Sequence, residues 1–135
     1  MLESLESNGA GLPRRAQDVP AVFAERFNSG DPQAVRELYE ADAAFVPRSG
    51  AAVYGGEAIA AENAPFLGLG QPISVRPRHV HVNGDIALLV VDWEVGEHGA
   101  QSTVRGTATD VARRGADGCW RYLIDSPFGG TGEPS

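Results

Sequence analysis

The hydrophobic residues near the start of the chain follow a helical spacing. Val19, Phe23 and Phe27 recur every four residues and would form one apolar stripe on a helix. Asp18 followed by Pro20 predicts the beginning of this helix, because aspartate is a favoured N-cap and proline is tolerated in the first turn. The pattern therefore predicts an amphipathic first helix.

Two more helices and a short strand are predicted before the middle of the chain. The pair Asp31-Pro32 predicts the start of a second helix by the same capping logic. The residues expected on its buried face are Val35, Leu38 and Tyr39. Residues 43–46 predict a short strand, and residues 57–66 predict a third helix.

The second half of the chain changes to an extended, alternating pattern. The predicted strands are residues 73–82, 86–95, 102–114 and 120–125. A strong turn signal, Asn83-Gly84-Asp85, separates the first two of them. Helices followed by antiparallel strands indicate an α+β fold, with the helices gathered on one face of a curved sheet.

Length and charge limit the possible classes of function. A chain of 135 residues predicts one domain, which we expect over residues 16–128 between flexible tails at 1–15 and 129–135. We expect a cytoplasmic protein, because residues 1–12 lack the features of a secretory signal and no apolar run is long enough to span a membrane. A net charge of -7 argues against nucleic acid and anionic membranes as partners.

The residue types also exclude several chemistries. All 11 basic residues are arginine, so the chain has no lysine for a Schiff base, for pyridoxal phosphate or for a phosphate loop. The single cysteine, Cys119, excludes an internal disulfide framework and a cysteine-based zinc site. His79 and His81 share one strand face, but the sequence places no third ligand beside them. We therefore expect neither a metal nor an organic cofactor.

Three stretches carry a resemblance to a known superfamily. They are FNSGDPQAVRELYEADAAFV, YGGEAIAAE and GTATDVARRGADGCWRYLIDSPFG. Over residues 19–129 the chain resembles the NTF2-like superfamily, which includes ketosteroid isomerase, SnoaL-like polyketide cyclases, limonene epoxide hydrolase and small SnoaL-like proteins of the DUF4440 type. The resemblance implies a cone in which three N-terminal helices pack on a curved, mostly antiparallel sheet. It also implies either an enzyme or a binding module, because this fold hosts both.

The catalytic residues of the best-known relatives carry over only in part. Ketosteroid isomerase uses an aspartate base, with a tyrosine and a protonated aspartate as hydrogen-bond donors. By this resemblance Phe23 stands at the tyrosine position and Pro47 at the base position, and Asp110 matches the protonated aspartate. Limonene epoxide hydrolase uses an Asp-Arg-Asp set, for which Ala108 stands where the arginine is expected. Chemistry other than that of a standard ketosteroid isomerase is therefore implied.

Two aspartates on neighbouring predicted strands are the candidate catalytic residues. Strand alternation places Ala108 on one face with Asp110, and Leu123 on one face with Asp125. The resemblance directs both faces into the cone, where two carboxyls could share a proton and serve as acid and base. The alternative is that both aspartates are exposed near strand ends or paired with arginines. The residues expected to bind substrate are Phe23, Tyr54, Phe66, Trp93, Ala108 and Leu123.

Two hypotheses of function follow from these residues. The first is a cofactor-independent enzyme that isomerises, cyclises or hydrates a small, hydrophobic, oxygenated molecule, with Asp110 as proton donor and Asp125 as the ionised partner. The second is a non-catalytic ligand-binding or assembly module. In either case the resemblance implies a homodimer formed through the outer sheet face. The residues expected on that face are His79, His81, Thr103, Arg105, Thr107, Thr109, Val111 and Arg113.

Overall fold

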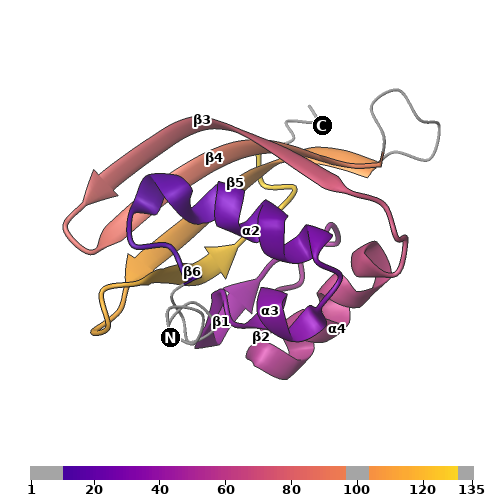
Figure 1. Ribbon diagram of the computed structural model, residues 1–135, viewed down its shortest axis with the longest axis horizontal. Helices are drawn as coiled ribbons and strands as arrows, with labels where there is room; N and C mark the ends of the chain where they lie inside the picture. Colours follow the sequence, from indigo (N-terminus) through magenta and orange to yellow (C-terminus); the bar gives the residue numbers. More distant parts are fainter. Residues whose placement is uncertain (1–10, 97–103, 131–135) are drawn as a thin grey trace, which may run out of the picture.

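A curved sheet of six strands forms one layer of the molecule, and the helices cover its inner face (Figure 1). The computed structural model describes residues 11–96 and 104–130. The strands are β1 (Tyr39–Phe45), β2 (Val53–Tyr54), β3 (Ile73–Asn83), β4 (Ile86–Val95), β5 (Val104–Arg114) and β6 (Trp120–Asp125). Their order is β2-β1-β6-β5-β4-β3, and all neighbours are antiparallel except β1 and β6.

The helices pack at two places on this sheet. A short 3-10 helix, η2 (Ala16–Asp18), leads into α2 (Val19–Asn28), which lies across the long strands (Figure 1). Helices α3 (Pro32–Arg36) and α4 (Gly56–Leu67) lie together beside β1 and β2. The predicted α+β architecture is confirmed, although α3 is a single short helix and only α2 and α4 are long.

The two predicted helix caps behave differently. Asp31 caps α3 as expected, because its side chain accepts a hydrogen bond from the Gln33 amide at 3.0 Å. Asp18 occupies the N-cap position of α2 and Pro20 lies in the first turn, as predicted, but the Asp18 side chain does not cap the helix. Asp18 continues the 3-10 turn in a helical conformation, and its side chain makes no cap hydrogen bond. The expectation of a side-chain cap at Asp18 is therefore wrong.

Tyr39 belongs to a strand, whereas the apolar spacing predicted that it would lie on the second helix. Helix α3 ends at Arg36, and β1 begins at Tyr39. The reason is the pairing with β6, in which the Tyr122 amide donates to the Leu38 carbonyl at 2.8 Å. Leu38 and Tyr39 are buried, as expected, but through the sheet.

The strands of the second half agree well with prediction. Strands β4 and β6 have the predicted bounds, and β4 alternates strictly between a buried and a more exposed face. Its buried residues are Ala87, Leu89, Val91, Trp93 and Val95. Pro77 is tolerated in β3 because β3 is an edge strand.

The residues predicted for the outer sheet face lie on that face, opposite the helices. Thr107, Thr109 and Val111 alternate along β5 with the buried Ala108 and Asp110. The rings of His79 and His81 stack on each other at 5.7 Å. Thr103 lies outside the described residues.

The packed part of the chain extends beyond the predicted domain limits at both ends. Leu12 is buried, and the Pro13 carbonyl accepts a hydrogen bond from the Trp120 amide at 2.8 Å. At the other end the Gly130 amide donates to the Thr107 carbonyl at 2.8 Å. Among the helices described, none has the length and apolar character to cross a membrane.

Candidate functional site

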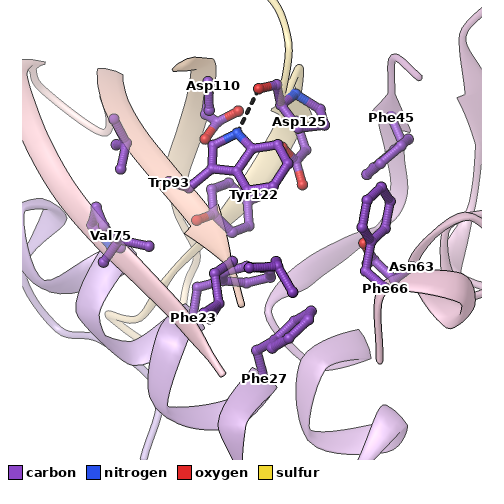
Figure 2. A pocket seen from close by; sticks show the side chains of 16 residues that line it. Phe23, Phe27, Phe45, Asn63, Phe66, Val75, Trp93, Asp110, Tyr122 and Asp125 are labelled. Atoms are coloured by element: carbon purple, nitrogen blue, oxygen red, sulfur yellow. Dashed lines mark hydrogen bonds between the residues drawn. The ribbon is translucent and has the colours of Figure 1, made fainter. Parts of the chain in front are cut away.

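A cavity opens between the inner face of the sheet and the helices (Figure 2). The centre of a water-sized molecule has about 60 Å³ of free space in this cavity. Strands β1 and β3–β6, helices α2 and α4 and the segment after β6 all contribute to its wall. The lining residues are Pro20, Phe23, Phe27, Phe45, Asn63, Phe66, Ile73, Val75, Val91, Trp93, Val95, Ala108, Asp110, Tyr122, Asp125 and Pro127.

The polar groups of the cavity gather at one end. Figure 2 shows Asp110 and Asp125 at the same end of the cavity as Trp93, while Phe23 and Phe27 lie at the opposite end. Asp110 is 4% exposed and Asp125 is 7% exposed, and their carboxyls are hydrogen-bonded to each other. Burial excludes the alternative in which these aspartates lie on the surface. The cavity is therefore apolar along most of its length and acidic at one end.

Three further groups hold the two carboxyls in place. The Tyr39 hydroxyl donates to Asp125 Oδ2 at 2.5 Å, and Asn63 Nδ2 donates to the Tyr39 hydroxyl at 3.3 Å. The Ser126 amide donates to Asp110 Oδ1 at 2.9 Å. Each carboxyl thus has a separate donor from the protein in addition to its contact with the other carboxyl.

These contacts decide which aspartate holds a proton. Burial raises the pKa of Asp110 well above its usual range, and the charge and hydrogen bond of Asp125 raise it further. Burial also raises the pKa of Asp125, but the hydrogen bonds from Asp110 and Tyr39 oppose that increase. The pair therefore keeps a proton on Asp110, which donates to an ionised Asp125.

The arginines of the two strands do not neutralise this pair. Arg121 forms an ion pair with Asp117 at 2.8 Å, and Arg105 is exposed on the outer face. No arginine or histidine is among the described residues that line the cavity. The alternative of arginine-paired aspartates is thus excluded as well.

Six of the eight residues proposed from the sequence lie in the cavity wall. These are Phe23, Phe66, Trp93, Ala108, Asp110 and Asp125. Tyr54 lies elsewhere: its partner in the sheet is Ala44 at the outer face, and its side chain is 68% exposed. Leu123 is displaced by a β-bulge, because Val111 and Ala112 pair with Ile124 and Tyr122 and leave Leu123 as the extra residue.

Three polar residues near the acidic end of the cavity were not among the site residues proposed from the sequence. Tyr39 was assigned to a helix, so its approach to Asp125 could not be seen. Asn63 is a buried polar residue within the apolar face of α4, and that pattern is the signal that could have found it. Strict alternation puts Tyr122 on the face opposite to Asp125, and only the β-bulge at Leu123 brings both residues to the same face.

The segment that follows β6 closes the acidic end of the cavity. Trp93 Nε1 donates to the Pro127 carbonyl at 2.7 Å, shown as the dashed line in Figure 2. The Thr109 amide donates to the Ser126 carbonyl at 2.9 Å, which holds the segment against β5. Trp93 therefore both lines the cavity and anchors part of its wall, as its polar tip requires when buried.

Within residues 11–96 and 104–130, no group of three or more histidine, cysteine, aspartate or glutamate side chains is arranged to hold a metal ion. The polar side chains among the lining residues are Asp110, Asp125, Asn63, Tyr122 and the indole of Trp93.

Comparison with known proteins places the chain in a family. The family model described as a SnoaL-like domain matches residues 21–123. The chain belongs to the SnoaL-like family. Among curated proteins, none matches the sequence at a significant level.

Solved structures share the fold of this SnoaL-like protein at low sequence identity. A ketosteroid isomerase-like protein from Erwinia carotovora atroseptica has a TM-score of 0.63 and 15% identity, covering 82% of this chain and 90% of its own. An NTF-2 like protein of unknown function from Shewanella oneidensis has a TM-score of 0.65 and 18% identity, covering 77% and 88%. A putative calcium/calmodulin dependent protein kinase II association domain from Xanthomonas campestris has a TM-score of 0.65 and 19% identity, covering 84% and 85%. These likenesses establish the NTF2-like fold of the chain.

Proposed function

We propose that this SnoaL-like protein is an enzyme that acts on a small, hydrophobic, oxygenated molecule by acid–base catalysis without a cofactor. The observation that carries the proposal is the pair of buried carboxyls, Asp110 and Asp125, at the end of an apolar cavity. Titratable groups with perturbed pKa values in a cleft are candidates for catalysis. A protonated and an ionised carboxyl in contact offer one acid and one base to the same ligand.

The contacts suggest a separate role for each carboxyl. Asp110, which holds the proton, would donate it to an oxygen of the substrate. Asp125, which is ionised, would accept a proton from a substrate carbon or from an attacking water. Isomerisation, cyclisation and hydration or hydrolysis all use such a pair. The Tyr39 hydroxyl supports this division, because its hydrogen bond to Asp125 favours the ionised form of that carboxyl.

The apolar walls support a hydrophobic substrate. Phe66 and Trp93 meet edge to face at 6.2 Å, and Phe23 and Phe27 lie 6.0 Å apart at the opposite end from the carboxyls. Such walls bind the body of a ligand, while a small number of polar groups at one end fix its orientation.

The proposal can be tested with two simple reactions. Proton exchange at the α-carbon of ketones in deuterated water reports acid–base catalysis at carbon, and hydrolysis of styrene oxide reports activation of water. We expect the wild-type protein to accelerate at least one reaction, and Asp110→Asn or Asp125→Asn to reduce that rate by about 100-fold or more. Asp18→Asn, which removes an exposed carboxyl, is the matched control and should keep the full rate.

Carboxyl-carbon NMR on the ligand-free protein tests the basis of these roles. The pair should titrate in two separate steps, with the upper step well above the reference aspartate value of about 3.9. Two independent titrations near the reference value would contradict the roles proposed for Asp110 and Asp125. Ligand binding without turnover of any substrate would instead favour the binding module.

We also infer that two copies of the chain associate through the outer sheet face. One row of outward side chains crosses all six strands, and its members are His81, Leu88, Val111, Ile124, Ala44 and Tyr54. Leu88 is 40% exposed and Ile124 is 38% exposed, so a second copy would bury apolar surface that is now open to solvent.

Light scattering should therefore give twice the monomer mass of 14.2 kDa at micromolar concentration. Leu88→Arg should produce the monomer. Leu69→Arg, at an exposed leucine beyond the sheet, should leave the dimer intact. A wild-type monomer at that concentration would contradict the inference.

A further inference from the structure

The Tyr122 hydroxyl is a polar group at the cavity wall that the proposed acid–base roles do not use. Tyr122 is 4% exposed and lines the cavity from β6. Figure 2 shows its hydroxyl directed toward the side of the cavity where Val75 lies. Within the part of the chain that the structure describes, this hydroxyl makes no hydrogen bond, whereas Asp110 and Asp125 each have donors.

The ring of Tyr122 is held firmly, so its hydroxyl has a fixed direction. It meets Phe23 edge to face at 5.9 Å and lies against Tyr39 at 5.3 Å. Among the described residues no buried side-chain oxygen or nitrogen lacks a hydrogen-bond partner, so the Tyr122 hydroxyl, which has no partner within the protein, is open to the cavity. A fixed hydroxyl at a cavity wall therefore indicates a partner that arrives with a ligand.

We propose that Tyr122 donates a hydrogen bond to an uncharged oxygen acceptor of the ligand, such as the carbonyl oxygen of a ketone. This inference rests on the proposed function in one respect, because it takes the cavity to be the ligand site. It adds a ligand-binding residue and narrows the ligand to a neutral molecule whose acceptor oxygen lies at the acidic end.

The charges around the site favour a neutral ligand over either kind of ion. A carboxylate ligand would meet two acidic groups, with no arginine or histidine among the described lining residues. An ammonium ligand would compete for Asp125, which already accepts hydrogen bonds from Tyr39 and Asp110. Burial, with the nearby Asp110 and Asp125, raises the pKa of Tyr122 well above its ordinary value, so the hydroxyl keeps its proton.

Four probes that share one benzene ring test this inference by binding alone. Acetophenone carries the neutral oxygen, ethylbenzene lacks it, benzoate is an anion and 1-phenylethylamine is a cation at neutral pH. Each is titrated into the full chain, and amide shifts in two-dimensional NMR give the dissociation constant and show whether Ala108 and Tyr122 respond. Tyr122→Phe removes the hydroxyl and keeps the ring, while Tyr54→Phe removes an exposed hydroxyl as the control.

We expect acetophenone to bind the wild type more tightly than the other three probes. Tyr122→Phe should raise the dissociation constant of acetophenone by about 5- to 10-fold, which corresponds to the loss of one net hydrogen bond. The same variant should leave the dissociation constant of ethylbenzene unchanged. Tyr54→Phe should change neither probe.

Several results would overturn the inference. These are equal affinities of acetophenone and ethylbenzene for the wild type, an unchanged acetophenone affinity in Tyr122→Phe, tighter binding of either ion, or no binding at the cavity. Failure of the proposed function would look different: acetophenone would still bind through Tyr122, while Asp110→Asn and Asp125→Asn would leave turnover unchanged.

Discussion

Replacing Asp110 with asparagine should make the folding stability of this protein much less dependent on pH. The amide of asparagine can reproduce the contacts of a protonated Asp110, because its oxygen can accept from the Ser126 amide and its nitrogen can donate to Asp125. The variant is therefore fixed in the state that the wild-type pair adopts when it holds its proton.

The sign of the wild-type pH dependence follows from the raised pKa of Asp110. Above about pH 4 an unfolded aspartate loses its proton, while the buried Asp110 keeps it, so the folded state binds more protons than the unfolded state. Stability is then complete below the unfolded pKa and decreases as pH rises toward the folded pKa. The slope for one proton is about 1.4 kcal/mol per pH unit, so two units within this window remove about 2.7 kcal/mol.

Urea unfolding at several pH values between about 4.5 and about 8 measures this slope. We expect the wild type to lose stability over the range and Asp110→Asn to lose much less, so that the two curves diverge as pH rises. Asp18→Asn removes an exposed carboxyl and should follow the wild type. Parallel curves for the wild type and Asp110→Asn would show that Asp110 does not hold a proton more tightly in the folded protein.

Three smaller changes test other contacts. Tyr39→Phe removes the donor to Asp125, so we expect a loss of about 1–3 kcal/mol in urea unfolding and a higher pKa of Asp125 in carboxyl-carbon NMR; an unchanged titration would contradict this. Trp93→Phe removes the hydrogen bond to the segment after β6, so amide exchange there should become faster while that of α4 stays the same. Asp31→Ala should cost about 1 kcal/mol of stability and Asp18→Ala much less, because Asp31 alone of these two caps its helix through its side chain; equal losses would refute the difference.

The fold could be predicted well because its signals are local and repeated. The alternation along β4 and the turn at Asn83-Gly84-Asp85 define a hairpin without reference to the rest of the chain. Tyr39 shows the limit of such signals. Its spacing from Val35 suits a helix, but pairing with β6, which lies more than 80 residues later, makes it the first residue of a strand.

The candidate site could be predicted in part for the same reason. Asp110 lies on a regular strand, so the alternation of side chains along the strand correctly placed it on the same face as Ala108. The same alternation gave the wrong position for Leu123, because a β-bulge adds one residue between two stretches of regular pairing. A bulge depends on the fit of two strands within the sheet and leaves no pattern of its own in this sequence.

The bulge at Leu123 is also what assembles the acidic end of the cavity. Tyr122 and Asp125 are separated by an odd number of positions, so a regular strand would direct them to opposite faces of the sheet. The extra residue shifts the alternation of side chains by one position, so Tyr122 and Asp125 are both buried on the inner face. The hydroxyl and the carboxyl therefore line the same cavity because one strand is irregular. The β-bulge that made the prediction for Leu123 wrong therefore also gives this cavity its combination of a hydroxyl and carboxyls.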